Sequence, residues 1–280
     1  MIVRKRINDF LMNLDIHDEG ISKVLYDHGG REKAFMFLLN QTVNNGMICL
    51  DLGGNIGYTT LTMLRNVGEE GFVYAVEPDS RSIEILKKNI IDNGYADRCE
   101  VTEYAISDYD GMIDFWESSK PNLSGIKKNS YSVTKKRVKC YSIKTFLEKR
   151  NYPNFVKMDV EGHEVKILES GLDYFEENHG STSILLEVHP QYYNENNNLE
   201  KILNEYFNLG FSCRWVVSTP IPQPKLFRKA GYKPLKTFHT DGFHRGLYNN
   251  IRNDDLIRFS CQEHYEKGSS KIVRSFLISR

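Results

Sequence analysis

The ten residues from Ile48 to Gly57 constrain this chain more than any other stretch. They begin with a run of apolar residues and Cys, interrupted only by Asp51, and end in a glycine-rich sequence. An apolar run without alternation is typical of a strand covered on both faces. Glycines after such a strand allow a tight turn and the close approach of a ligand. With a helix starting near Tyr58, we predict a strand, a turn and a helix whose free N–H groups face a ligand.

Asp51 narrows the choice of ligand. A dinucleotide-binding fold places a pyrophosphate at this turn and requires the spacing Gly-x-Gly-x-x-Gly. Here Asn55 replaces the second glycine, and a carboxylate at the strand end would repel a pyrophosphate. The carboxylate would instead suit an ammonium group, such as that of S-adenosylmethionine (SAM), which carries no phosphate. The alternative is that Asp51 only forms the turn or caps the helix.

A second acid, Glu77, follows the apolar run 72–76, twenty residues beyond Gly57. This spacing predicts an acid at the tip of the neighbouring strand, where it can accept hydrogen bonds from ribose hydroxyls. Asp51 and Glu77 together favour SAM over NAD. The alternative for Glu77-Pro78 is a plain end to the strand.

Composition and charge exclude several classes of protein. Lys plus Arg and Asp plus Glu both number 37, so net charge gives no case for nucleic acid or a membrane surface as partner. The five cysteines are scattered without a C-x-x-C pair, which favours free thiols in a reducing cytoplasm over a zinc site. No run of about 18 apolar residues and no export signal is present, so we predict a cytoplasmic protein without a membrane span.

Strand and helix patterns alternate from residue 47 onward, which predicts a mostly parallel sheet with helices on both faces. Residues 1–46 show helical spacing and predict a helical lead-in packed on the core, which could also line the cofactor or acceptor mouth. Beyond about 255 the pattern predicts little, so 256–280 is treated as a C-terminal extension. Seven strands are expected, at 47–52, 72–77, 99–106, 155–162, 183–190, 211–218 and 243–249.

The alternation is interrupted by a basic segment, 118–140. Asp110-Gly111 is a hairpin signal followed by a short strand at 112–116. Residues 118–140 hold seven Lys or Arg and no Asp or Glu. The simplest interpretation is a solvated loop or hairpin, and the alternative is a mobile flap that helps to bind an anionic or glycosyl acceptor.

Acids and a histidine follow the fourth and fifth predicted strands. The tips of parallel strands meet at one edge of a sheet, so Asp159, Glu187 and His189 are expected beside the cofactor. Methyl transfer to a hydroxyl needs positioning and is helped by a base, for which His189 is the first candidate. The alternatives are a structural histidine before Pro190, and a divalent-metal site, with Mg²⁺ as the ion, built from the same three residues. Glu164 could simply support its own helix.

Several motifs of other enzyme classes are missing. The fourth strand tip has no Asn/Asp-Pro-Pro-Tyr/Phe, a mark of amine methylation, and the chain has neither a Gly-x-Ser-x-Gly elbow nor a P-loop. His239, Asp241 and His244 could approach a metal, but with no third carboxylate or Cys nearby they are interpreted as loop residues.

Over residues 45–215 the chain resembles the FkbM-like methyltransferases. The resemblance rests on five blocks in family order: Asp51–Thr60, Ala75–Pro78, Ala105–Asp108, Lys157–Glu164 and Leu186–His189. It implies a Rossmann-like class I methyltransferase, with a doubly wound sheet, that usually acts on hydroxyls of polyketides, sugars or glycans. The implied cofactor residues are Asp51, Gly53, Asn55 and Gly57 at the methionine part, Glu77 at the ribose, and Ala105 and Ile106 at the adenine. Gly54 and His163 stand where the family more often has Ala, and His163 bears on the acceptor side.

The sequence therefore predicts a SAM-dependent O-methyltransferase domain at 47–255, acting on a small-molecule or glycan hydroxyl. One rival is an NAD-dependent oxidoreductase on the same architecture, disfavoured by Asp51 and the missing glycine. The other is a module that binds SAM without turnover. Neither the acceptor nor the oligomeric state follows from the sequence.

Overall fold

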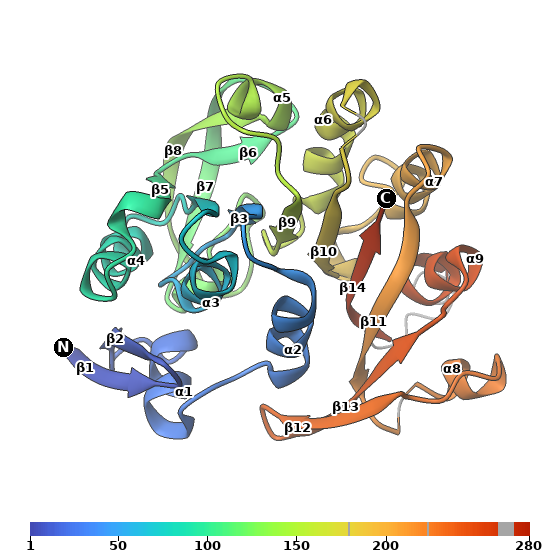
Figure 1. Cartoon of the computed structure of the whole chain (residues 1–280), viewed down its shortest axis with the longest axis horizontal. Helices are drawn as coiled ribbons and strands as arrows, with labels where there is room; N and C mark the ends of the chain where they lie inside the picture. The colour runs from blue at the N-terminus through green and yellow to red at the C-terminus, as the bar shows by residue number, and fades with distance from the viewer. Residues whose placement is uncertain (179, 223, 263–271) are drawn as a thin grey trace.

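A nine-stranded sheet forms the centre of the computed structural model, which describes residues 1–178, 180–222, 224–262 and 272–280 (Figure 1). Five neighbouring strands are parallel and carry the predicted alternation. Four antiparallel strands extend the sheet beyond the fifth. In spatial order the strands are β12 (Lys236–Thr240), β13 (Phe243–Asn249), β11 (Ser212–Pro220), β14 (Val273–Ser279), β10 (Ser183–Glu187), β9 (Phe155–Met158), β3 (Ile48–Leu52), β4 (Phe72–Val76) and β5 (Cys99–Thr102).

Both faces of the parallel strands are covered, as their continuous apolar runs predict. Successive side chains of a strand point to opposite faces, so Cys49 and Leu50 of β3 enter different cores. Cys49 packs in the core under α2 (Lys33–Thr42), α3 (Tyr58–Val67) and α4 (Ser80–Asp92). Leu50 packs in the core under α5 (Ile143–Leu147), α6 (Glu164–Glu177), α7 (Leu199–Asn208) and α9 (Asn253–Ile257). The expected doubly wound α/β architecture is therefore present, and Asp79 rather than Ser80 caps α4.

The predicted helical lead-in is wrong for its first half. Residues 2–15 form an antiparallel hairpin of β1 (Ile2–Ile7) and β2 (Phe10–Asp15), and helices begin only with α1 (Ile21–His28). Phe10, Met12 and Leu14 are buried, which is the period-two pattern of a strand. Asn8 has φ +51° and makes the turn, since Asn tolerates the left-handed conformation better than most residues. Helical spacing of the same apolar residues had concealed this alternation.

The C-terminal segment is part of the sheet and not an appendage, because it supplies β14. Together β14 and the unpredicted β12 raise the expected seven strands to nine. Figure 1 shows β14, at the red end of the chain, beside β10 and β11. Ser275 of β14 lies opposite Glu187 of β10 in this antiparallel pair. Just beyond it, the N–H of Val188 donates to the carbonyl of Arg274 at 2.9 Å. This pairing brings Arg274 to the tip of β10. Part of the predicted extension, residues 263–271, lies outside the described residues.

The basic segment 118–140 belongs to a second small sheet. The predicted strand 99–106 is divided, because β5 ends at Thr102 and β6 (Ala105–Ser107) pairs instead with β8 (Ser132–Ser142), which pairs with β7 (Gly111–Ser118). Between β7 and β8 lies a turn of 3₁₀ helix, η2 (Pro121–Leu123), whose residues line the cavity at the edge of the large sheet. The flap is therefore a hairpin whose connecting loop reaches the cavity described below.

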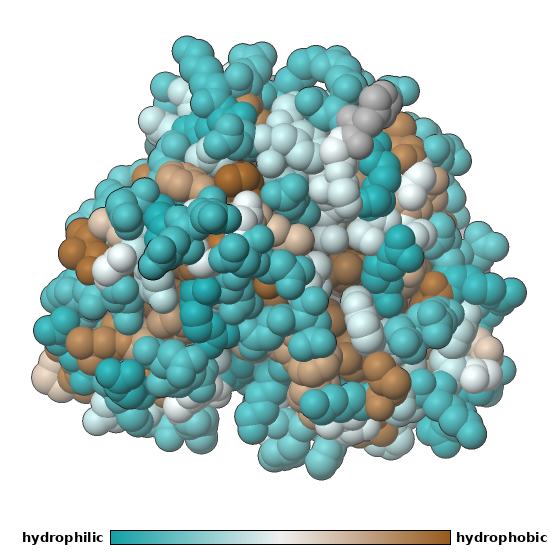
Figure 2. Space-filling model, viewed as in Figure 1, coloured by the Kyte–Doolittle hydropathy of each residue, from teal (hydrophilic) through white to brown (hydrophobic). Residues whose placement is uncertain are grey.

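The exterior is polar. On the face in Figure 2, hydrophilic residues predominate and hydrophobic residues form small separate patches. All five cysteines are free. Within the described ranges, no helix has the length and apolar character needed to cross a membrane.

Candidate active site

A cavity of about 510 Å³ opens at the carboxyl ends of β3, β4, β9 and β10. Small-molecule sites are commonly of this size and at this edge of a doubly wound sheet. Its wall combines three groups of residues: the loop 52–55, the β4 tip with β6 and η2, and charged residues from β9, β10, β14 and the N-terminal segment. The charged members are Arg31, Glu32, Glu77, Lys157, Asp159, Glu161, Glu187, His189 and Arg274.

The glycine loop packs too tightly for a side chain at Gly53. A Cβ there would lie 2.1 Å from the carbonyl oxygen of Asp159, and φ at Gly53 is +83°. The N–H groups of Gly53 and Gly54 both donate to the carbonyl of Val76 at 3.0 Å. The loop therefore lies against the tips of both neighbouring strands, and its backbone forms part of the cavity wall. Gly57 does not line the cavity; it precedes α3 with φ +93° and packs against Leu86.

Asp51 lies beneath this loop and does not line the cavity. Its carboxylate is fully buried, lies 3.1 Å from Nζ of Lys157 and accepts hydrogen bonds from the hydroxyls of Thr59 and Thr60. Lys157 in turn donates to the carbonyl of Gly53 at 2.6 Å. Asp51 therefore holds Lys157, and Lys157 holds the loop. The predicted contact between Asp51 and a ligand's ammonium group stays a prediction.

Glu77 stands at the tip of β4, in the cavity wall. Its two oxygens accept the N–H groups of Asn55 at 2.8 Å and Asp79 at 2.7 Å. Burial raises the pKa of Glu77 to about 7, because the charged form loses hydration. The carboxylate is thereby fixed in place with free lone pairs toward the cavity, as a ribose acceptor needs.

Beyond Glu77 the wall becomes apolar. Ala105 and Ile106 of β6 line it, as predicted, together with Pro78 and Phe115. The η2 loop adds Leu123, so the basic flap closes this end of the cavity with its apolar connection and not with its lysines. A flat, uncharged ring such as adenine fits this chemistry.

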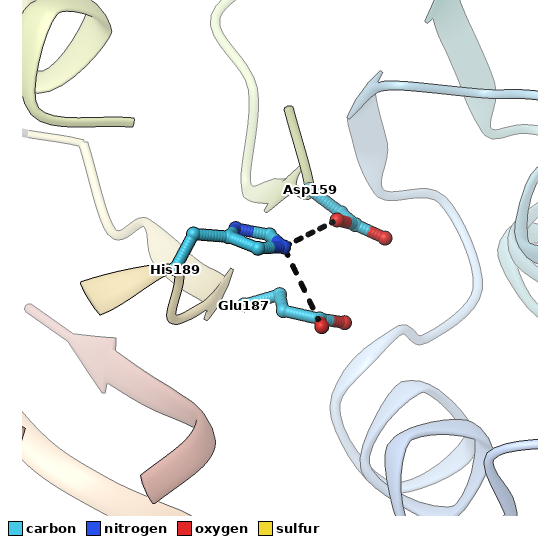
Figure 3. A group of neighbouring side chains, drawn as sticks. All are labelled: Asp159, Glu187 and His189. Carbon is cyan, nitrogen blue, oxygen red and sulfur yellow. Dashed lines mark ion pairs between the residues drawn. The ribbon is translucent and has the colours of Figure 1, made fainter. Parts of the chain in front are cut away.

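His189 is the centre of a buried charged cluster at the tips of β9 and β10. Its Nδ1 lies 2.7 Å from Oε1 of Glu164, the first residue of α6. Its Nε2 faces three carboxylates, with oxygens of Glu161 and Glu187 at 3.6 Å and of Asp159 at 3.8 Å. Figure 3 shows the ring directed between Asp159 and Glu187. All three predicted catalytic residues therefore meet in one place.

Burial and mutual repulsion disturb the protonation of this cluster. Burial and the charge of Glu187 raise the pKa of Asp159 to about 6, and burial raises that of Glu161 to about 8. Burial alone would lower the pKa of His189, but the charge and hydrogen bond of Glu164 outweigh it and raise the pKa to about 9. At neutral pH, Glu161 and His189 therefore retain their protons, while Asp159 is mostly ionised.

Two arginines connect the cluster to both ends of the chain. Nη1 of Arg274 lies 2.6 Å from Glu187, and its Nη2 lies 2.6 Å from Glu32. Glu32 also pairs with Arg31 at 3.1 Å. The second half of the N-terminal segment thus lines the cavity, as the sequence had left open.

The model of the methyltransferase FkbM domain matches residues 51–213, more than half of the chain. The chain belongs to the FkbM methyltransferase family. Its cofactor is SAM, and its fold is the Rossmann-like one that the resemblance implied. The expectation of FkbM membership is confirmed.

Individual similar proteins add only context. A protein-L-isoaspartate O-methyltransferase from Thermotoga maritima is 37% identical over 79 residues, which are 26% of this chain and 25% of that relative. A methyltransferase FkbM structure from Methylobacillus flagellatus is 15% identical with a TM-score of 0.41, over 72% of this chain and 43% of its own. An O-methyltransferase from Bacillus cereus in complex with SAH is 15% identical with a TM-score of 0.40, over 85% and 84%. Scores this low support no conclusion about substrate or reaction.

The cavity of this FkbM protein fits SAM in three respects. A loop backbone without side-chain cover stands beside a fixed carboxylate at the β4 tip, and an apolar wall follows it. Three functional residues were missed by sequence reasoning: Lys157, Arg274 and the role of Glu164. A lysine between Val156 and Met158, in an otherwise apolar strand, was the available signal for the first. No local sequence pattern indicated that Arg274 reaches the cavity or that Glu164 is the hydrogen-bond partner of His189.

Proposed function

We propose that this FkbM protein transfers the methyl group of SAM to a hydroxyl group of a small molecule or glycan. The observation that carries the proposal is the cluster of Asp159, Glu187 and His189 beside the glycine loop. Such a cluster can receive the proton that a hydroxyl loses on methylation. No Asn/Asp-Pro-Pro-Tyr/Phe occupies the β9 tip, where Asp159-Val160-Glu161-Gly162 stands instead, which favours oxygen over amine acceptors.

Five of the predicted cofactor residues are proposed to contact SAM. Gly53 and Asn55 would meet its methionine part, Glu77 its ribose hydroxyls, and Ala105 and Ile106 its adenine; all five line the cavity. Asp51 and Gly57 are proposed to act indirectly, by holding the loop and starting α3. When bound, SAM supplies an electrophilic methyl group on a sulfonium whose leaving group is already activated.

The chain's own residues then have two tasks. The first is positioning, because an in-line displacement needs the acceptor oxygen opposite the sulfur. The second is proton removal: as the C–O bond forms and the S–C bond breaks, the electron pair stays on sulfur and the hydroxyl proton passes to the cluster. At neutral pH the proton acceptor is a carboxylate, since the pKa of His189 is raised to about 9 while that of Asp159 is about 6. His189 then orients the carboxylates by its charge.

The test is a transfer assay with methyl-labelled SAM against panels of hydroxylated small molecules and glycans. We expect labelled, alkali-stable methyl ether product with the wild type and with His244→Ala, an exposed histidine that does not line the cavity. We expect about 10²–10⁴-fold less product with Asp159→Asn. Binding of NADH in place of S-adenosylhomocysteine (SAH) would revive the oxidoreductase. Hydrolysis of SAM with no transfer in any panel would favour the binding module.

A further inference from the structure

We propose that Asp159, Glu187 and His189 bind a divalent first-row transition-metal cation, with Mn²⁺ as the probe. One ligand atom of each residue lies within 4.8 Å of the other two. Figure 3 shows one ring nitrogen of His189 facing a carboxylate oxygen of Asp159 and one of Glu187. A nitrogen ligand combined with carboxylate oxygens suits Mn²⁺, Fe²⁺ or Zn²⁺ better than Mg²⁺, which prefers oxygen and water. Within the described ranges, no other group of three such residues lies this close.

The orientation of His189 is the first independent observation. The ring is only 4% exposed, and its Nδ1 is engaged by Glu164, whose side chain is fully buried. A metal-ligating histidine characteristically donates its second nitrogen to a carboxylate, which fixes the tautomer and makes the ligating nitrogen more basic. Glu164 holds His189 in this manner and directs Nε2 toward Asp159 and Glu187.

The spacing around Nε2 is the second observation. No hydrogen bond of Nε2 is found among the described residues, and the nearest carboxylate oxygens are 3.6 to 3.8 Å away. Those distances exceed the usual length of a charge-assisted hydrogen bond, about 2.7–2.9 Å. Two ligand atoms that are each about 2.1 Å from one ion lie roughly 3–3.4 Å apart. The distances from Nε2 to Asp159 and Glu187, 3.8 and 3.6 Å, are a few tenths of an ångström longer than this, and all three ligand atoms lie within 4.8 Å of one another, so a small inward movement of the side chains would enclose an ion.

The charge balance points the same way. Lys157, Arg274 and Arg31 each have a carboxylate of their own, in Asp51, Glu187 and Glu32. In the part of the chain that the structure describes, His189 is the one ion-pair partner of both Asp159 and Glu161. The cluster therefore carries an excess of negative charge in a site partly shielded from water, and a divalent cation would balance it.

Binding of the cation stands independently of the reaction, but its chemical role rests on the proposed function. A cation at this point would take the place of the proton on Nε2 of His189, which is released to solvent on binding. It would bind the acceptor's oxygen and lower the pKa of that hydroxyl. The proton would then leave more readily at neutral pH, and the acceptor would be placed beside the glycine loop.

The experiment is a titration of metal-stripped protein with Mn²⁺. Binding is measured by electron paramagnetic resonance, as the decrease in the signal of free Mn²⁺. We expect one Mn²⁺ per chain in the wild type and its loss in His189→Ala and in Asp159→Asn. Glu164→Gln should weaken binding by about 10–100-fold, because it leaves the ligands in place and removes their support. His244→Ala is the matched control and should bind Mn²⁺ as the wild type does.

SAH binding and circular dichroism confirm that each variant is folded, so a loss of Mn²⁺ is not mistaken for unfolding. The absence of Mn²⁺ binding in the wild type would overturn the proposal. So would binding that survives both His189→Ala and Asp159→Asn, or that is lost in His244→Ala. A protein that binds Mn²⁺ but methylates no hydroxyl would refute the proposed function and leave the metal site standing. A protein that binds no Mn²⁺ but methylates hydroxyls would refute the metal site and leave the proposed function standing.

Discussion

The two halves of the cavity are built in different ways. The cofactor half comes from residues 51–126, which supply the glycine loop, Glu77 and the apolar wall of β6 and η2. Beneath its loop, the carboxylate of Asp51 is paired with Lys157 of β9. The acceptor half collects Glu32, Asp159–Glu164, Glu187–His189 and Arg274 from the whole length of the chain, and its negative charges outnumber their partners. This contrast supports the proposal that the first half holds SAM and that the second half carries out the chemistry on the acceptor.

The largest expected effect separates the halves directly. Asp159→Asn should reduce methyl transfer by about 10²–10⁴-fold, because it removes the proton acceptor. Its SAH affinity should change little, since the loop contact at Asp159 is made by the backbone carbonyl. Steady-state kinetics and calorimetry measure the two effects. If SAH binding fell as far as transfer did, the halves would not be separable.

The buried pair beneath the loop should dominate stability. Lys157→Met leaves the carboxylate of Asp51 uncompensated, so we expect the free energy of unfolding to fall by about 3–5 kcal/mol. Urea denaturation measures it. The double variant Lys157→Met with Asp51→Asn removes the stranded charge and should recover much of the loss. Equal destabilisation in the single and double variants would show that packing, and not charge, explains the effect.

A smaller effect is expected where the N-terminal hairpin meets the cofactor half. Oδ1 of Asn89 in α4 accepts the backbone N–H of Asn13 at 2.6 Å, and its Nδ2 donates to the carbonyl of Ile56 at 2.8 Å. Asn89→Ala leaves these buried groups unpaired, so stability should fall by about 1–3 kcal/mol. SAH affinity, measured by calorimetry, should weaken as well because Ile56 lies within the loop. Unchanged affinity would separate the hairpin from the site.

The smallest effect concerns the pH dependence of cofactor binding. Burial raises the pKa of Glu77 to about 7, and ribose hydroxyls donate to its charged form. Binding therefore favours the deprotonated state, and SAH affinity should rise as pH increases through 7. About one tenth of Glu77 is ionised at pH 6 and about nine tenths at pH 8, so we expect roughly a tenfold change. Glu77→Gln should bind more weakly and lose most of this dependence, and an unaltered slope in that variant would assign the titration to another group.

The local sequence pattern was sufficient to predict an element wherever its own residues determine its structure. The apolar run of β3, the glycines that follow it and the acid at Glu77 are recognisable from their spacing alone, so the parallel core and the position of Glu77 in the cavity wall were predictable. The N-terminal hairpin was not, because Ile7, Phe10, Leu11 and Leu14 fit a helical period as well as the alternation of a strand. In so short a segment, the same apolar residues fit both the period of a helix and that of a strand, and the sequence does not distinguish them.

The acceptor half depended on tertiary structure. The sequence brought Asp159, Glu187 and His189 to strand tips, because parallel strands end at one edge. That Glu164 holds His189, that Lys157 holds the glycine loop, and that Arg274 reaches Glu187 followed only from the folded chain. These contacts join residues up to 242 positions apart, as between Arg274 and Glu32. Such contacts are set by strand pairing between distant segments and by the need of buried charges for partners, and neither leaves a local period in the sequence.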